Sequence, residues 1–298
     1  MGRAPGGQHD AVTEFPSVPG VEHRFVQAGD VRLHVAEAGA GDPVVLVHGW
    51  PQHWYCWRHV VPRLANDHRV VCPDLRGFGW SDAPRSSYAK RELAGDLIAL
   101  LDAMGLDRVR LVGHDWGGFV AFLVALQAPE RVSSLLALSI VHPWAGPPGL
   151  GVLPRLPLLA YQPLVAAPLL GPLVQRLPPL YEAIFASAGG RRIWTAEERA
   201  AFITALREPA RAEATSRLYR TFLLHELPAI ARGTYAEEHL TVPARLVVGH
   251  SDPVVTAAGL RGYETHADDM KVEFIEGGHF LPEEQPDAVA ERIHAMAG

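Results

Sequence analysis

The pentapeptide Gly113-His114-Asp115-Trp116-Gly117 has the pattern of a reactive side chain held on a tight turn. It follows a β-branched run at 109–112 and precedes an apolar, helix-forming stretch at 119–127. Glycines at such a turn let neighbouring backbone pass close to the strained central residue. Serine is the usual residue there, but this chain has Asp115. Because a carboxylate nucleophile forms an alkyl ester, the sequence predicts displacement at a saturated carbon, as with epoxides or alkyl halides.

Two further candidates follow later strand-like runs. Asp252 comes after the apolar run at 246–248, and His279 comes after the run at 272–275, with glycines near each. Catalytic residues of open parallel sheets lie at the carboxyl ends of the strands. The chain order of nucleophile, acid and histidine is that of the α/β-hydrolases. We therefore expect Asp115, Asp252 and His279 to form a catalytic triad.

A third strand-like run, at 44–47, leads into His48-Gly49-Trp50-Pro51. This position places backbone N–H groups at the carboxyl edge of the sheet. We expect the amides of Trp50 and Trp116 to hold one oxygen of Asp115 and later to stabilise an oxyanion. His48 and His114 are expected to be structural.

Short β-rich runs alternate with helical patterns, which predicts an α/β protein with a largely parallel sheet. A hairpin is expected over 22–36, with its turn at 28–30. A helix is expected over 91–104 and ends at Gly105. The predicted strands are 23–26, 31–36, 44–47, 69–72, 109–112, 135–138, 246–248 and 272–275.

The alternation stops near Pro143, and no strand candidate occurs before Thr241. We therefore expect a flexible arm at 1–20, a core at 21–142, an all-helical lid at 143–232 and the rest of the core at 233–298. The lid is inserted between the sixth and seventh strands. Its underside is expected to be apolar because of a group of leucines, Leu150, Leu153, Leu156, Leu158 and Leu159.

The bulk composition excludes several classes of protein. The chain has 298 residues and a net charge of −6 without a cluster of Lys and Arg, which argues against nucleic-acid binding. Cys56 and Cys72 lack metal-ligand spacing and are expected to be buried thiols in a reducing compartment. The first 20 residues lack a secretory apolar core, and prolines interrupt every long apolar stretch. We expect a cytoplasmic protein that has no membrane span.

Three motifs resemble those of α/β-hydrolase-fold epoxide hydrolases: His48-Gly49-Trp50-Pro51, the run at 74–82 (DLRGFGWSD) and the run at 113–118 (GHDWGG). The resemblance extends from about Phe25 to the C-terminus and is weaker in the lid. It implies an α/β-hydrolase fold with a mostly parallel eight-stranded sheet. It also implies two lid tyrosines that protonate the epoxide oxygen. Tyr161, followed by Gln162, matches the first, and Tyr219 matches the second in part, because Leu218 stands where an aromatic residue is common. Tyr181 is a spare candidate.

Haloalkane dehalogenases share part of these motifs and remain an alternative. One group carries Asn at the position of Trp50 and an acid after the sixth strand, where residues 140–142 contain none. Another takes a halide donor from a lid tryptophan, for which Trp144 and Trp194 are candidates. Fluoroacetate-type enzymes use arginines near the nucleophile, where this chain has Trp116 and Phe119. A third hypothesis is a non-catalytic receptor with the same fold.

The sequence thus favours an epoxide hydrolase that converts a hydrophobic epoxide and water to a vicinal diol, with a role in detoxification. We expect no metal, no organic cofactor and no nucleic-acid partner, and a homodimer is possible.

Overall fold

The computed structural model describes residues 15–145, 159–187 and 193–296. All the predicted strands are present, each within a few residues of its expected bounds. They form one eight-stranded sheet in the order β1-β2-β4-β3-β5-β6-β7-β8. The strands are β1 (Glu22–Ala28), β2 (Val31–Ala38), β3 (Asp42–Val47), β4 (His68–Pro73), β5 (Val109–His114), β6 (Val132–Leu138), β7 (Ala244–Gly249) and β8 (Met270–Ile275).

The sheet is mostly parallel, as expected. β1 and β2 form the predicted antiparallel hairpin, closed by the pair Ala28 and Val31, and β2 also runs antiparallel to β4. The remaining pairings, from β3 and β4 through to β7 and β8, are parallel. Their carboxyl ends therefore meet at one edge of the sheet, where ligands bind in folds of this type.

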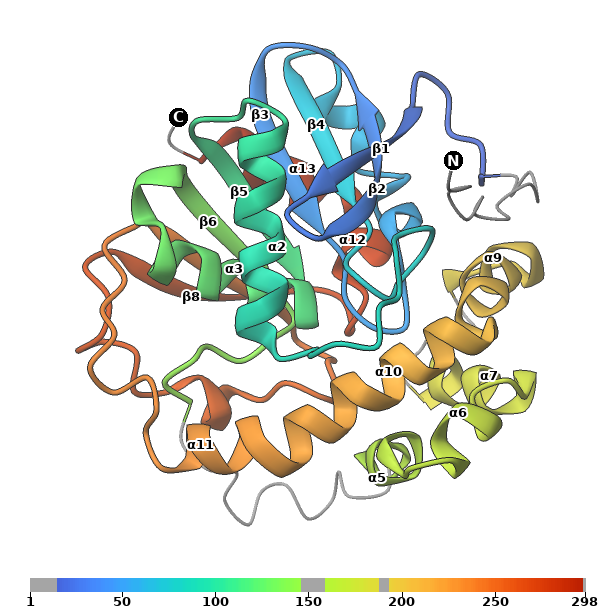
Figure 1. The fold of residues 1–298 in the computed structure, drawn as a ribbon. Coiled ribbons are helices and arrows are strands. Elements are labelled where there is room, and N and C mark those ends of the chain that lie inside the picture. The colour runs from blue at the N-terminus through green and yellow to red at the C-terminus, as the bar shows by residue number, and fades with distance from the viewer. Residues whose placement is uncertain (1–14, 146–158, 188–192, 297–298) are drawn as a thin grey trace, which may run out of the picture.

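Helices cover both faces of the sheet (Figure 1). The predicted helix at 91–104 is α2 (Lys90–Ala103), and the stretch at 119–127 belongs to α3 (Trp116–Gln127). α2 and α3 lie in front of the sheet in the figure, and α12 (Leu281–Glu284) and α13 (Pro286–His294) lie behind it. Every residue of β6 is buried, because this strand is central and is covered on both faces.

Helices fill the described part of the chain between β6 and β7, and no strand occurs there. They are α5 (Tyr161–Ala166), α6 (Leu170–Val174), α7 (Pro178–Ser187), α9 (Ala196–Leu206), α10 (Pro209–Thr221), the π-helical turn η4 (Phe222–Glu226) and α11 (Leu227–Ala231). We call them the helical insertion. They gather at the bottom of Figure 1. Of the leucines expected beneath the lid, Leu159 is half-buried, and Leu150, Leu153, Leu156 and Leu158 lie outside the described residues.

The end of the expected N-terminal arm is packed rather than free. Phe15 stacks on His23 of β1 with ring centroids 4.2 Å apart, and Val18 is buried. Residues 1–14 lie outside the described part of the chain. In the part that is described, no helix is both long enough and apolar enough to cross a bilayer.

Candidate functional site

Asp115 lies on the turn between β5 and α3 with a backbone φ of +50°. Non-glycine residues rarely adopt this left-handed conformation, and such strain is commonly found at functional sites. The Trp50 amide donates a 2.8 Å hydrogen bond to Oδ1 of Asp115. The loop that carries this amide comes close because residue 49 is glycine: a Cβ there would lie 2.4 Å from the Cβ of Asp115. The turn therefore presents a carboxylate that is already oriented.

Asp252 and His279 follow β7 and β8, and the structure brings both to Asp115. Nδ1 of His279 lies 3.0 Å from Oδ2 of Asp252, and Nε2 lies 3.7 Å from Oδ2 of Asp115. The amides of Val254 and Val255 donate to Oδ1 of Asp252 at 2.7 and 3.1 Å. Asp252 therefore lies at the Nδ1 side of the imidazole, and Asp115 lies at the Nε2 side.

The two carboxylates control the charge of His279. Burial by itself lowers the pKa of this imidazole, but Asp252 and Asp115 outweigh burial and raise the pKa to about 10. Burial acts in the opposite direction on Asp252, whose pKa His279 and the two backbone amides hold below its usual value. At neutral pH the resting site therefore contains an imidazolium between two carboxylates.

His114 is structural, as expected, although it adjoins Asp115. Its Nε2 donates a 2.8 Å hydrogen bond to the carbonyl oxygen of His279. Burial lowers the pKa of His114 to about 4, so its ring stays neutral. His48 is also buried, and its Nε2 accepts from the amide of Leu75 at 3.0 Å. These contacts hold the loops that carry His279 and Trp50.

The tyrosines predicted from the lid motifs meet above this site. Oη of Tyr161, the first residue of α5, lies 3.0 Å from Oη of Tyr219 in α10. The ring of Trp50 stacks on Tyr161 with centroids 5.0 Å apart and meets Tyr219 edge-on at 5.1 Å. Burial raises the pKa of both phenols, and the charge of Asp115 adds to the rise. Both therefore keep their protons at neutral pH.

Tyr181, the spare candidate, lies apart from the hydroxyl pair. Its side chain is fully buried, and its hydroxyl donates to Oε1 of Gln175 at 3.3 Å. Gln175 in turn donates to the carbonyl oxygen of Ala212 and to Ser216 Oγ, so this contact joins α7 to α10. The structure does not put Tyr181 in place of Tyr161 or Tyr219.

Trp116 differs from the expectation. Among the described hydrogen bonds its amide makes none to the carboxylate of Asp115, because Oδ1 turns to Trp50 and Oδ2 faces His279. Its indole Nε1 instead donates to Oη of Tyr219 at 3.4 Å. Of the two amides expected at the Asp115 carboxylate, only that of Trp50 binds it, whereas Trp116 contacts the insertion through its side chain.

No sequence motif predicted the buried lysine that packs against Trp116. Lys90 is fully buried, with Nζ 4.3 Å from the centre of the Trp116 ring and 2.7 Å from Oε2 of Glu226 in η4. Burial lowers the pKa of Lys90, and Glu226 opposes that shift. A lysine at the start of an amphipathic helix ordinarily lies in solvent, so only the folded insertion reveals this contact.

A second ion cluster joins the insertion to the core. Arg58, almost fully buried, lies 2.9 Å from Glu198 of α9 and 2.6 Å from Glu283 of α12. Burial raises the pKa of Glu283 to about 7 although Arg58 opposes the shift. Glu283 lies four residues after His279, so this cluster connects the insertion with the loop that carries the histidine.

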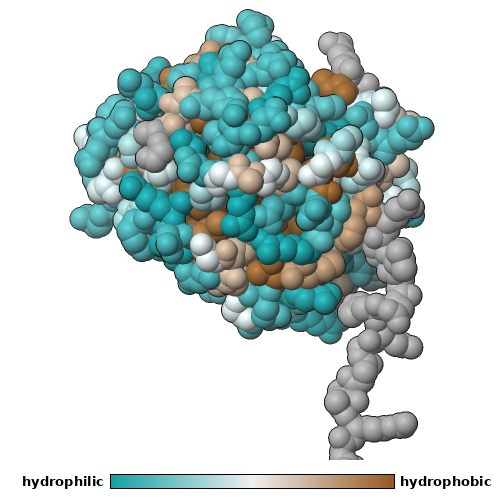
Figure 2. Space-filling model, turned by 90° about the horizontal axis from the view of Figure 1, so that it is seen from above, coloured by the Kyte–Doolittle hydropathy of each residue, from teal (hydrophilic) through white to brown (hydrophobic). Residues whose placement is uncertain are grey.

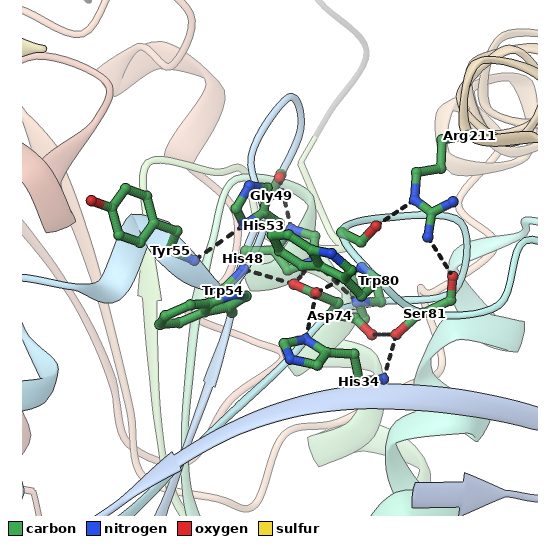
Figure 3. Close-up of polar contacts among 12 residues, drawn as sticks. His34, His48, Gly49, His53, Trp54, Tyr55, Asp74, Trp80, Ser81 and Arg211 are labelled. Atoms are coloured by element: carbon green, nitrogen blue, oxygen red, sulfur yellow. Dashed lines mark hydrogen bonds and ion pairs between the residues drawn. The ribbon is translucent and has the colours of Figure 1, made fainter. Parts of the chain in front are cut away.

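The motif at 74–82 forms a buried network that supports the Trp50 loop (Figure 3). Asp74 accepts hydrogen bonds from the amides of Trp54 and Trp80 at 2.8 and 3.0 Å, and it lies 2.7 Å from Nδ1 of His34. Burial alone raises the pKa of Asp74, but His34 holds it below its usual range. Arg211 reaches from α10 to the carbonyl oxygens of Gly79 and Ser81. The role of this motif is therefore structural.

The tryptophans considered as halide donors lie elsewhere. The indole N–H of Trp144 is already shared between the carbonyl oxygens of Tyr235 and Glu238, at 2.9 and 3.0 Å. Trp194 has its ring 4.6 Å from both Phe185 and Phe280, and Phe280 in turn lies 5.2 Å from the ring of His279. Neither ring contacts the pair Tyr161 and Tyr219 in the described contacts.

Comparisons with known proteins agree with this architecture. A family model of the α/β hydrolase fold matches residues 42–162. The AB hydrolase superfamily protein YfhM of Bacillus subtilis is 30% identical over 286 residues, which cover 92% of this chain and 97% of that protein. The solved structure of the epoxide hydrolase CorEH superposes with a TM-score of 0.81 at 27% identity, covering 93% of this chain and 98% of that one.

Two curated relatives with different activities match less than half of this chain. Epoxide hydrolase 2 of Siraitia grosvenorii is 45% identical over 123 residues, 40% of this chain and 39% of that protein. The fluoroacetate dehalogenase of a Burkholderia species is 41% identical over 127 residues, 41% of this chain and 42% of that protein. This chain thus matches less than half the length of either enzyme. The near-complete match to YfhM and the eight-stranded sheet show that the chain belongs to the α/β-hydrolase superfamily.

Proposed function

We propose that the protein is an epoxide hydrolase, which converts a hydrophobic epoxide and water to a vicinal diol through a covalent ester on Asp115. The observation that carries this proposal is the pair of hydroxyls of Tyr161 and Tyr219, 3.0 Å apart. An opening epoxide develops an alkoxide on the substrate and needs a proton donor, whereas a leaving halide does not. The likeness to curated and solved epoxide hydrolases adds support.

In the first step, a carboxylate oxygen of Asp115 attacks an epoxide carbon while the carbon–oxygen bond breaks. Asp115 Oδ1 is held by the Trp50 amide, which orients the carboxylate for attack. Tyr161 and Tyr219 bind the epoxide oxygen, and one of them transfers its proton to the oxygen as the ring opens. The indole N–H of Trp116, which reaches Tyr219 Oη, stabilises the negative charge that develops on that tyrosine.

In the second step, His279 takes a proton from a water that attacks the carbonyl carbon of the ester. The resting imidazolium, whose pKa is raised to about 10, is a poor base. Ester formation turns Asp115 into a neutral group and removes one of the two carboxylates that hold the imidazole protonated. The imidazolium then gives up its proton, which returns to the tyrosine that protonated the epoxide oxygen, and the neutral imidazole can act as the base. Asp252 continues to orient the ring, and the Trp50 amide stabilises the oxyanion. Collapse of this intermediate breaks the bond between the ester carbonyl carbon and the substrate oxygen. That oxygen takes the proton of the re-formed carboxyl group, which releases the diol and restores the Asp115 carboxylate, while His279 keeps the proton from water as the resting imidazolium.

The proposal is tested by measuring diol formation from an aryl epoxide and bromide release from a brominated alkane side by side on the purified chain. We expect diol formation to exceed bromide release. We also expect the double variant Tyr161→Phe Tyr219→Phe to abolish diol formation, while the matched control Tyr181→Phe leaves it intact. Bromide release that is faster than epoxide turnover and indifferent to the double variant would instead identify a haloalkane dehalogenase.

Fluoroacetate hydrolysis is the alternative that the Burkholderia relative suggests. It requires cations for the substrate carboxylate, and Trp116 and Phe119 occupy the neighbourhood where the family resemblance places arginines. Fluoride release from fluoroacetate, measured in the same assay, tests this alternative. The role in detoxification, the cytoplasmic location and the homodimer remain predictions.

A further inference from the structure

The region around α6 leaves a row of leucines uncovered. Leu169 is 85% exposed, Leu173 58% and Leu177 57%. Leu169 is the residue before α6 (Leu170–Val174), Leu173 lies within it and Leu177 follows it by three residues, so the three exposed side chains border one short helix. Two more exposed leucines, Leu170 of α6 and Leu164 of α5, extend the same apolar area, because α5 and α6 pack together. We call these five residues the leucine surface.

The leucine surface is unusual for this molecule. Elsewhere in the described chain the large exposed hydrophobic residues, Phe25, Leu224 and Phe274, are single and far apart in the sequence. Hydrophilic residues predominate on the face seen in Figure 2, which is the top of Figure 1 and lies opposite the insertion. Scattered exposed apolar residues need no partner, but a contiguous group of them indicates an interaction surface.

The chain segment that carries the leucine surface contains an arginine but no carboxylate. No Asp or Glu occurs between Pro143 and Tyr181, although the chain has 33 acidic residues. Arg176 and Arg207 line a surface hollow together with Leu173 and Leu177. Glu208, next to Arg207, is engaged by Arg211. The surface therefore combines exposed leucines with two arginines whose charge it does not itself neutralise.

We propose that the leucine surface docks on an anionic lipid membrane, with the leucines among the acyl chains and the arginines at the phosphates. Amphipathic surfaces of this kind bind by burying apolar area and by attraction to anionic headgroups. A second copy of the chain is less suitable as the occupant. A two-fold contact would bring Arg176 and Arg207 of both copies together, with no carboxylate of the stretch 143–181 to pair with them.

Flotation with lipid vesicles tests the apolar part of this proposal, independently of the reaction. Wild-type protein is mixed with vesicles of phosphatidylcholine in which roughly one-third is phosphatidylglycerol. We expect the double variant Leu169→Ser Leu173→Ser to lower the partition coefficient about tenfold, because two side chains that would be buried in the bilayer lose their apolar contact with it. Leu224→Ser is the matched control, since Leu224 is 64% exposed but lies outside the surface, and should bind as the wild type does.

The charged part is tested by changing both the lipid and the protein. Pure phosphatidylcholine vesicles should bind the wild type several-fold less. Arg176→Gln should lower binding about fivefold on anionic vesicles only, whereas the exposed Arg108→Gln should not. The proposal is overturned if no vesicle binds the protein, or if Leu224→Ser binds as weakly as the double variant. It is also overturned if sedimentation shows a dimer that the double variant dissociates without any change in vesicle binding.

Discussion

The core half and the insertion half of the candidate site are held in place by different contacts. Asp115 lies on a strained turn, and backbone amides position both its carboxylate and that of Asp252. Tyr161 and Tyr219 are positioned by each other and by the ring of Trp50, which are contacts between side chains. The geometry of the core half is therefore set by the fold itself. That of the insertion half depends on how its helices pack.

This difference predicts the largest effect for loss of Asp115. Asp115→Ala removes the only proposed nucleophile, so turnover should fall on the order of 10⁵-fold or more. Single turnover of the wild type in ¹⁸O-labelled water should place the label in the Asp115 carboxylate, as detected by peptide mass spectrometry. An unlabelled carboxylate would rule out the covalent route.

His279→Gln should separate the two steps. Ester formation needs no base, so it should proceed, whereas steady-state turnover should fall on the order of 10²–10⁴-fold. The ester should then accumulate, and intact-mass spectrometry should detect the protein with the mass of one substrate added. If this variant turns over at the wild-type rate, His279 is not the base.

The tyrosines should show a smaller and shared effect. Either Tyr161→Phe or Tyr219→Phe should slow ester formation on the order of 10²-fold, because an alkoxide then leaves with one donor instead of two. The two effects should not be additive, since both hydroxyls act on one oxygen. Pre-steady-state kinetics of ester formation measures this, with Tyr181→Phe as the matched control. If Tyr161→Phe and Tyr219→Phe form the ester as fast as Tyr181→Phe does, Tyr161 and Tyr219 take no part in the reaction.

The charge of His279 predicts how the stability of the core half depends on pH. Its pKa in the folded protein, about 10, lies above the unfolded value of about 6.5. The imidazolium therefore contributes stability that is fully present below about pH 6.5 and is lost as the pH rises through about 10. Urea denaturation should show that the free energy of unfolding is higher for the wild type than for His279→Gln. This difference should be largest near pH 6 and should shrink toward pH 10. A difference that stays constant over this range would contradict the assigned ion pairs.

The smallest effect concerns the attachment of the insertion. Glu198→Gln removes one of the two carboxylates that contact Arg58, while Glu283 remains. The local opening free energy of α9 should fall by about 1–2 kcal/mol, between the values for exposed and buried pairs. Hydrogen exchange of the α9 amides measures this. Asp102→Asn, which breaks the more exposed pair with Arg131, serves as the control and should leave α9 unchanged.

The sequence predicted most of the fold because its signals are local. The run at 109–112, which begins and ends with valine and is followed by Gly113, predicts a strand and then a turn, and β5 and the turn at Asp115 lie there. Helix α2 was predicted to within one residue at each end because its apolar periodicity is clear. The same local motifs identified Asp115, Asp252 and His279, which the structure brings together.

The contacts that could not be predicted are all between distant segments. The burial of Lys90 depends on η4, which lies more than 130 positions further along the chain. Tyr181 and Tyr219 are both buried tyrosines of the insertion, and only the contacts of the folded chain distinguish them, because Tyr181 bonds Gln175 whereas Tyr219 meets Tyr161. The Trp116 amide was expected to bind the Asp115 carboxylate because Trp116 directly follows Asp115 in the sequence. Whether this hydrogen bond forms depends on the orientation of the Asp115 side chain, which a sequence pattern does not encode.

The ion pairs between the insertion and the core also restrict how the insertion can move. Among the described residues these pairs involve α9 and η4, through Arg58–Glu198 and Lys90–Glu226. Helices α5 to α7 form none of these ion pairs, and their described ring contacts with the core are to aromatic residues such as Trp50 and Phe280. Separating an ion pair leaves buried charge behind, whereas sliding an aromatic contact does not. If the insertion opens during turnover, the aromatic contacts of α5 and α7 with the core should therefore separate first, and the ion pairs of α9 and η4 last.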